Sequence, residues 1–289
     1  MENKDGIREF LASRRAKLTP EQAGLPAYGT NRRVKGLRRE EVAMLAGISV
    51  EYYTRLERGN THGVSDDVLE GIVRALQLDE AERAHLFDLV RAASNTNAPR
   101  RRPAQERVRQ SVQQILDSIN APAYVRNERL DILAANRIGE ALYSPVFDFA
   151  SQPANSARFM FLSPLAPEFF VDWDTVSHDA VAILRSAAGR DPYDKRLTDL
   201  IGELSTRSEE FRVRWAAQNV KFHRTGTKRF HHPVVGDLVL NFEALELAAD
   251  PGQRINIYTA EPGSASHDAL NLLASWISTP ADADTKGDP

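Results

Sequence analysis

The stretch RREEVAMLAGISVEYYTRLERG, residues 38–59, is typical of two short helices joined by a tight turn. Gly47 is expected to adopt the positive φ that ends the first helix, and Ser49 is placed to cap the second. Small and apolar side chains recur where two steeply crossed helices pack against each other. These inner positions are Val42, Ala43, Ala46, Ile48, Tyr53 and Leu56. The stretch therefore predicts a helix-turn-helix.

The outer face of the second helix keeps mostly polar and aromatic side chains that are free to enter a groove of DNA. With the cap residue, they are Ser49, Val50, Glu51, Tyr52, Thr54, Arg55 and Arg58. Glu51, Tyr52 and Arg55 are the best candidates for base reading, because arginine pairs with guanine and glutamate accepts a hydrogen bond from cytosine. The stretch, with its LERG ending, resembles the Cro/repressor-like helix-turn-helix of the XRE class. The plain alternative is an ordinary helical hairpin in a larger α domain.

The charge of the chain is uneven. The net charge is −3, but residues 1–103 hold 18 Lys and Arg against 15 Asp and Glu, and the remainder carries −6. Residues 4–39 contain ten basic and three acidic side chains, a surplus that attracts a phosphate backbone. The loop before the motif and the first residues of the motif supply the candidates for phosphate contact, with Arg39 also near a base: Arg32, Arg33, Lys35, Arg38 and Arg39. A solvated basic surface is the alternative.

Three further helices complete the predicted DNA-binding domain. Apolar spacing predicts a first helix over residues 5–17, Ser65 is placed to cap a fourth, and Asp79 with Glu82 starts a fifth. Five helices with one apolar stripe each are enough to close a small core. The resemblance to the repressor-like class implies an ion pair between Arg15 and Glu57. In the alternative, Arg15 faces DNA or water.

The remaining chain predicts a second domain of the α+β class. We place the helix-turn-helix domain at 1–94, a linker at 95–105, the second domain at 106–280 and a disordered tail at 281–289. The second domain contains a helix over 108–120, a hairpin over 123–134, a helical middle, and three apolar segments of strand length near its end. This order predicts an antiparallel sheet with helices over one face. It resembles a PAS-like fold, which leaves space for a ligand between sheet and helices.

Several motifs in combination extend the resemblance to nearly the whole chain, residues 6–264. Besides GLRREEVAMLAGISVEYYTRLERG, these are PAYV, the DW at 172–173, AAGRDP, GELS and YTAEPGS. Together they are similar to the MmyB-like family of bacterial transcription regulators. The resemblance implies an XRE-type, lambda-repressor-like DNA-binding domain joined to a PAS-like domain that accepts a small apolar molecule such as a fatty acid.

No catalytic constellation is recognisable in residues 106–289, so we do not expect an enzyme or a cofactor. The chain has no cysteine, which excludes disulfides, thiolate metal sites and covalent flavin chemistry on a thiol. His231 and His232 are adjacent on a predicted strand and should point to opposite faces, so no metal site is expected. No apolar run of membrane-spanning length or signal core occurs, and we expect a cytoplasmic protein.

Large apolar side chains of the second domain are candidates for ligand contact, although core packing is the default role of each. They are Phe161, Trp173, Trp215, Phe242 and Tyr258, with Asn136 and Arg185 as candidates at the pocket mouth for a carboxylated ligand. The alternative for Asn136 and Arg185 is a surface or helix-capping role. The main hypothesis is a ligand-responsive, homodimeric regulator that binds double-stranded DNA. In a second hypothesis the C-terminal domain only dimerises or binds a protein. An enzyme fused to a DNA-binding head is a third.

Overall fold

The computed structural model describes residues 2–26, 34–94, 107–149, 153–218 and 225–278. Contacts between residues divide the chain into two compact units. The first unit comprises residues 1–101, 181–205 and 211–222, and the second comprises residues 102–180, 206–210 and 223–289. The predicted linker 95–105 and the predicted tail 281–289 lie outside the described residues.

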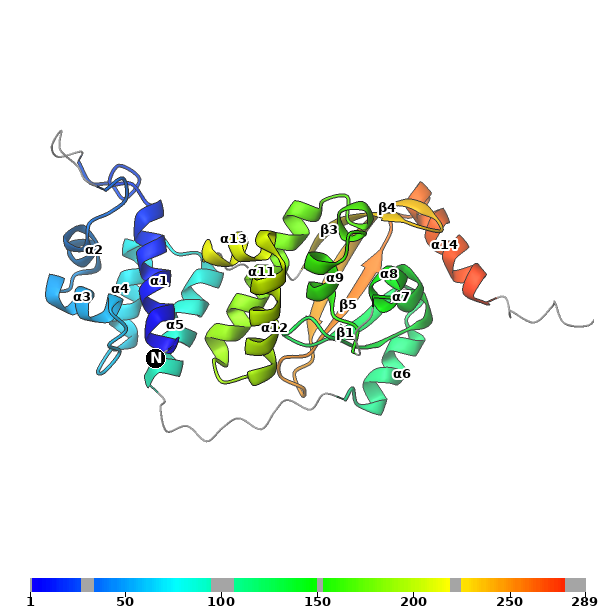
Figure 1. Cartoon of the computed structure of the whole chain (residues 1–289), viewed down its shortest axis with the longest axis horizontal. Helices are drawn as coiled ribbons and strands as arrows, with labels where there is room; N and C mark the ends of the chain where they lie inside the picture. The colour runs from blue at the N-terminus through cyan, green and yellow to red at the C-terminus, as the bar shows by residue number, and fades with distance from the viewer. Residues whose placement is uncertain (1, 27–33, 95–106, 150–152, 219–224, 279–289) are drawn as a thin grey trace, which may run out of the picture. The chain divides into compact units, whose positions relative to one another are not determined.

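The first unit contains the five expected N-terminal helices around one apolar core (Figure 1). They are α1 (Glu2–Lys17), α2 (Arg39–Ala46), α3 (Val50–Glu57), α4 (Asp66–Ala75) and α5 (Glu80–Ser94). The inner positions predicted from the helix-turn-helix spacing are confirmed, since Val42, Ala43, Tyr53 and Leu56 are fully buried. Ile48 and Ala46 pack against the same core. Helices α1–α5 form the all-α, five-helix arrangement that the sequence predicts, and the unit also takes in residues 181–205 and 211–222, which the sequence assigned to the second domain.

Local hydrogen bonds explain why α2 and α3 begin and end where they do. Gly47 has φ 69°, and the backbone N–H groups of Gly47 and Ile48 donate to carbonyls of the last turn of α2. Ser49 Oγ accepts from the Tyr52 backbone N–H at 3.1 Å, which satisfies one of the free donors at the start of α3. Both predicted cap positions are therefore confirmed.

The other predicted helix starts are also confirmed. Ser65 Oγ accepts from the Val68 backbone N–H at 3.4 Å at the start of α4. At the start of α5, the Asp79 and Glu82 side chains each accept from the backbone N–H of the other, at 2.8 and 3.1 Å. The first helix begins at Glu2, three residues before the predicted Asp5.

The second part of the chain has the predicted α+β composition. Its helices are α6 (Gln110–Ser118), α7 (Arg137–Leu142), α8 (Ser144–Phe147), α9 (Ser156–Leu162), α10 (Ala166–Phe169), α11 (Trp173–Arg190), α12 (Lys195–Arg207), α13 (Glu209–Ala216) and α14 (Ala265–Ser278). Its strands are β1 (Ala123–Arg126), β2 (Ile132–Ala135), β3 (Thr225–His232), β4 (Gly236–Glu246) and β5 (Arg254–Thr259). Residues of α11, α12 and α13 are divided between the two units.

The five strands form one antiparallel sheet in the order β2-β1-β5-β4-β3 (Figure 1). The predicted hairpin and the three C-terminal strands are all present, so the expected α+β fold is confirmed. One face of β1 and β5 packs on α6 through an apolar cluster that includes Val112, Leu116 and Ile255. The opposite, inner face carries Phe230 and Tyr258, which pack against aromatic side chains of the segment that contains α7–α10. The prediction of helices over one face is therefore wrong, because both faces of the sheet carry apolar side chains and both are covered.

One helix of the second unit was not anticipated. Helix α14 was not predicted, although Leu270 and Leu273 give it a buried side and its residues contact β4 and α7. Among the described helices, none combines the length and apolarity needed to cross a membrane.

Candidate nucleic-acid interface and the ligand-domain core

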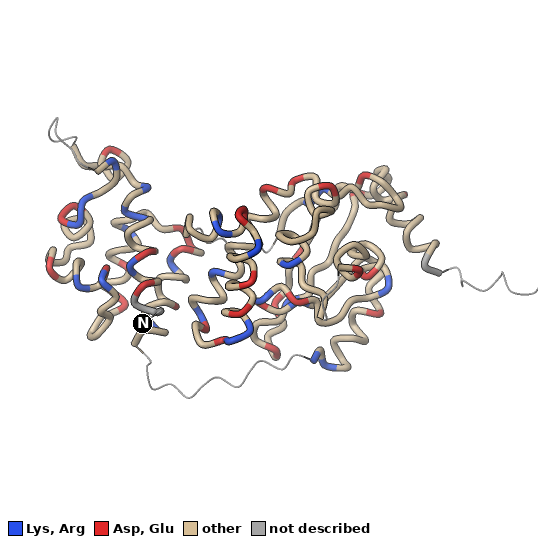
Figure 2. The backbone as a smooth tube through the Cα atoms, in the orientation of Figure 1, with Lys and Arg blue, Asp and Glu red and all other residues tan. Residues whose placement is uncertain are grey.

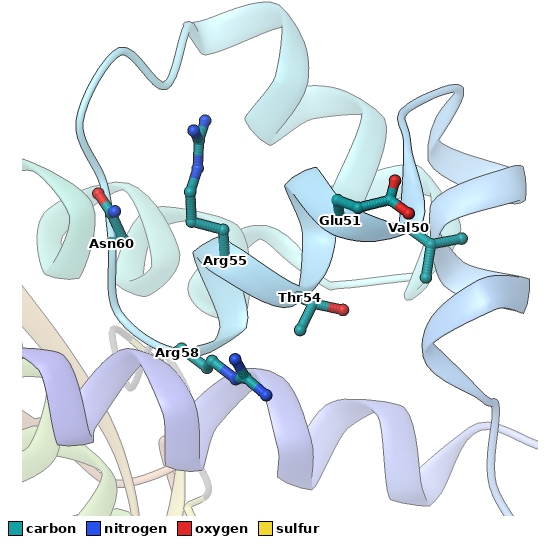
Figure 3. A pocket seen from close by; sticks show the side chains of 6 residues that line it. All are labelled: Val50, Glu51, Thr54, Arg55, Arg58 and Asn60. Atoms are coloured by element: carbon teal, nitrogen blue, oxygen red, sulfur yellow. The ribbon is translucent and has the colours of Figure 1, made fainter.

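The outer face of α3 is exposed and polar, as the sequence predicts. Glu51, Arg55 and Arg58 are exposed, Val50 is 41% exposed, and Thr54 is half-buried. These side chains and Asn60 line a hollow of about 480 Å³, and Figure 3 shows them along α3 and the loop that follows it. The side chains that line the hollow can form hydrogen bonds with base edges in a DNA groove, because Arg55 and Arg58 are donors and the Glu51 carboxylate is an acceptor.

Tyr52 is held in place rather than free. Its hydroxyl donates to the Gly63 carbonyl oxygen at 3.4 Å, and the Arg55 guanidinium lies 4.9 Å from the centroid of its ring. A cation over an aromatic face is a favourable arrangement. The ring of Tyr52 therefore restrains the Arg55 guanidinium through a cation–π contact. The base-reading candidates Tyr52 and Arg55 are in contact with each other.

The last residue of α3, Glu57, is a buried junction of three helices. Its side chain has no exposed surface, Arg15 Nε of α1 donates to its Oε1 at 2.9 Å, and Arg39 Nε of α2 donates to its Oε2. The implied Arg15–Glu57 ion pair is confirmed. The bond from Arg39 was not foreseen, since Arg39 was considered only as a DNA contact; its side chain remains 47% exposed. One carboxylate thus fixes the position of the helix that carries the outer face.

The loop before α2 presents basic side chains beside this face. Leu37 is fully buried and its N–H donates to the Arg15 carbonyl oxygen at 2.9 Å, while Lys35 and Arg38 on either side of it are exposed. Arg38 also forms an ion pair with Glu40 at 3.4 Å. The basic positions of this loop and the acidic positions of the first turn of α2 are coloured blue and red in Figure 2. The other two predicted phosphate contacts, Arg32 and Arg33, lie outside the described residues.

Asn60 is a lining residue that sequence reasoning missed. It follows α3 and the Arg58–Gly59 pair, beyond the last position of the helix-turn-helix spacing. Its Oδ1 accepts from the His62 backbone N–H at 3.2 Å, which orients the side chain beside the hollow. An asparagine directly after a LERG ending was the available signal, but loop positions have no periodicity that assigns them to a face.

The side chains predicted for ligand contact fall into separate groups. Phe242 and Tyr258 are neighbours on paired strands, with ring centroids 6.1 Å apart on the inner face of the sheet. Phe161 and Trp173 form a second pair, at 6.4 Å. Trp215 belongs to the first unit, where it stacks on Phe211. Only Phe242 and Tyr258 are therefore brought together on the sheet face.

The two predicted mouth residues are engaged with the protein itself. Asn136 Oδ1 accepts from the backbone N–H groups of Gly139 and Ala123, at 2.8 and 3.1 Å, and its Nδ2 donates to three carbonyl oxygens. Arg185 belongs to the first unit, where its Nη1 donates to Gln218 Oε1 at 2.5 Å. Its guanidinium also lies 4.0 Å from the centroid of the Trp215 ring. Asn136 thus caps the N-terminus of α7. Arg185 of α11 contacts Trp215 of α13 and Gln218, which follows α13.

The adjacent histidines point to opposite faces of β3, as predicted. His231 is exposed and lies 2.6 Å from Asp237 Oδ1, whereas His232 is 1% exposed and its Nε2 lies 3.0 Å from the Ala141 carbonyl oxygen. Burial lowers the pKa of His232. Within the part of the chain that the structure describes, no group of three or more His, Cys, Asp or Glu is arranged to hold a metal ion.

Comparisons with known protein families agree with this architecture. Residues 8–86 match the model of a helix-turn-helix domain, and residues 108–273 match the model of the MmyB-like transcription regulator ligand binding domain. No curated protein matches the chain. The matched regions coincide with the five-helix domain and with the sheet-containing domain. The chain is therefore a member of the MmyB-like transcription regulators, with a DNA-binding helix-turn-helix domain and a ligand-binding domain.

Proposed function

We propose that this regulator binds a pseudo-palindromic DNA site as a homodimer and that a small apolar, fatty-acid-like molecule in its C-terminal domain controls the binding. The observation that carries the DNA-binding part is the outer face of α3, where exposed Glu51, Arg55 and Arg58 stand on a fully buried inner face. A dimer related by a two-fold axis would place its two copies of α3 about 34 Å apart, in successive turns of the major groove.

In this proposal the side chains have two roles. Arg55, Glu51 and Tyr52 read base edges, and Thr54, Arg58, Val50 and Ser49 line the same surface. Lys35, Arg38 and Arg39 contact phosphate, together with Arg32 and Arg33 of the preceding loop. Arg39 would share its charge between Glu57 and a phosphate, since almost half of its side chain is exposed.

The substitution Arg55→Ala tests the base-reading role. It should weaken discrimination between a selected site and random DNA by roughly 1–3 kcal/mol, because a bidentate contact to guanine is lost. Lys35→Ala should weaken binding to both duplexes about equally and reduce the dependence of affinity on salt. The measurement is a titration of each variant with both duplexes at several salt concentrations, after the site has been selected from random duplexes.

Arg91→Ala is the matched control. Arg91 is an exposed arginine of α5, so its removal changes the net charge equally without altering the outer face of α3. Equal losses for Arg55→Ala and Lys35→Ala on both duplexes would contradict the division of roles.

Control by a ligand requires that the ligand bind two states of the protein with different affinity. Native mass spectrometry of gently purified protein, with and without the selected duplex, measures both the dimer and any co-purified small molecule. A dimer that retains a small molecule and changes its DNA affinity when the molecule is removed supports the proposal. A ligand-free dimer with unchanged DNA affinity supports the alternative, in which the C-terminal domain serves dimerisation or protein contact.

A further inference from the structure

The outer face of α3 carries two rows of side chains that differ in chemistry. Residues three or four positions apart are neighbours on a helix surface. One row therefore consists of Val50, Thr54 and Arg58, and the row beside it consists of Glu51 and Arg55. All five line the hollow on this face (Figure 3). The first row begins with methyl groups and the second holds only charged groups, so the face offers apolar contacts and hydrogen bonds side by side.

Val50 is an exposed apolar side chain at the first position of α3. It is 41% exposed, whereas Tyr53 and Leu56 of the same helix are fully buried in the core. A single exposed apolar side chain is ordinary on a protein surface. This one, however, lies on the face that is proposed to enter the groove, four residues before the half-buried Thr54. The methyl groups of Val50 and Thr54 therefore form one continuous apolar ridge.

The charged row beside this ridge is not engaged in an internal ion pair. A glutamate four residues before an arginine is a favourable pair on a helix surface. Glu51 and Arg55 have this spacing and are both exposed, yet neither forms an ion pair with any residue that the structure describes. The Arg55 guanidinium lies instead over the ring of Tyr52. The carboxylate and the guanidinium thus both remain available to DNA.

The base edges of the major groove differ in a way that matches the two rows. Thymine presents a methyl group there, at C5, whereas guanine presents two acceptors and cytosine an amino donor. Contact with the methyl group removes apolar surface from water and strengthens binding about fourfold for each methyl group buried. A carboxylate or a guanidinium gains nothing comparable from it. Val50 and Thr54 therefore suit thymine, and Glu51 and Arg55 suit a G·C pair.

We propose that Val50 and Thr54 recognise the C5-methyl groups of thymines next to a G·C pair that Arg55 and Glu51 recognise by hydrogen bonds. The inference rests on the proposed DNA binding and specifies which feature of the bases these residues contact. Four residues of a helix span roughly 6 Å, and stacked base pairs are about 3.4 Å apart. Each half-site should therefore hold a thymine within about two base pairs of a G·C pair.

Deoxyuridine tests this assignment, because it lacks the C5-methyl group of thymidine and keeps its hydrogen-bonding groups. A site is first selected from random duplexes with the full-length protein. Each thymine is then replaced in turn by deoxyuridine, and the affinity is measured by fluorescence anisotropy. The wild type should lose about fourfold in affinity at each contacted thymine. Val50→Ala or Thr54→Ser should remove this loss at the thymine that the substituted residue contacts, because the methyl groups on the protein side are gone.

Val234→Ala is the matched control. Val234 is a 46% exposed valine in the turn between β3 and β4, so the substitution removes the same methyl groups without altering α3. It should keep the wild-type loss at every contacted thymine, and thermal unfolding shows that each variant folds. A selected site without thymine, a wild type that is insensitive to deoxyuridine, or undiminished losses in both α3 variants overturns the inference and leaves DNA binding intact. Failure to select any duplex contradicts the proposed DNA binding, and the inference with it.

Discussion

The two domains differ in whether their buried charged side chains have partners of opposite charge. In the helix-turn-helix domain, the buried carboxylate of Glu57 is held by Arg15 and Arg39, so each charge has its partner within the fold. In the ligand-binding domain, Arg126 and Lys228 lie on the inner sheet face without an acidic partner among the described residues. A paired buried charge fixes geometry, whereas the cost of burying an unpaired charge is not offset within the fold.

The largest expected effect is at Glu57. Glu57→Gln should lower the free energy of unfolding of the helix-turn-helix domain by about 3 kcal/mol, because it leaves Arg15 without its buried partner. Urea unfolding of the full-length chain, followed by helical circular dichroism, measures the loss. Glu51→Gln is the control on the same helix, and because Glu51 is exposed it should change stability by less than about 0.5 kcal/mol. Similar losses for both variants would remove the distinction between a structural and a surface carboxylate.

A second effect concerns a buried group that stays neutral. Burial lowers the pKa of His85 to about 3, helped by the charges of Arg185, Arg14 and Arg190. The unfolded chain binds the proton near pH 6.5, so stability is present above that pH and is lost as pH falls toward 3. Between pH 7 and pH 5 the loss should be about 2 kcal/mol.

Thermal unfolding of the wild type and His85→Phe across this pH range measures the effect. Phenylalanine keeps a ring against Phe10, whose centroid lies 5.1 Å away, and removes the titration. The variant should lose less stability on acidification. It will keep some pH dependence, because burial also lowers the pKa of His232. Parallel curves for the two proteins would show that His85 does not titrate during unfolding.

The smallest expected effect has the opposite sign. Lys228→Met should raise the free energy of unfolding of the ligand-free protein by about 1 kcal/mol, because an unpaired and partly buried charge is replaced by an apolar side chain of similar length. Arg229→Met, on the exposed face and paired with Asp172, should give no increase. Calorimetric unfolding of the two variants without ligand makes the comparison. A loss of stability for Lys228→Met would mean that Lys228 is structural, like Glu57.

The features that depend on neighbouring residues in the chain could be predicted from the sequence. Gly47, Ser49 and Ser65 were assigned correctly as helix ends because their bonds join residues only a few positions apart. The buried side of the helix-turn-helix followed from helical spacing, as Val42, Tyr53 and Leu56 show. The five strands could be predicted because apolar residues alternate along a strand with a period of about two residues, whereas they recur about every 3.6 residues along a helix.

The features that depend on pairing between distant segments could not be predicted. Arg126 and Lys228 share a face only through the register of β1, β5, β4 and β3, which no local pattern specifies. Asn136 was considered for a ligand because it follows an apolar strand, but its position at the start of α7 commits it to backbone groups. Arg39 likewise looked like a surface cation until the fold brought Glu57 beside it.

The support of Arg55 by Tyr52 has a consequence for how the domain recognises DNA. A long side chain normally loses conformational entropy when it binds, about 0.5–1.5 kcal/mol for each one immobilised. Arg55 already rests on an aromatic ring, and the hydroxyl of that ring bonds to Gly63 in the loop after α3. In the proposed base-reading role of Arg55, part of the ordering is therefore complete before DNA arrives. We expect the loop that contains Gly63 to contribute to affinity through this preorganisation, at a distance from the base edges themselves.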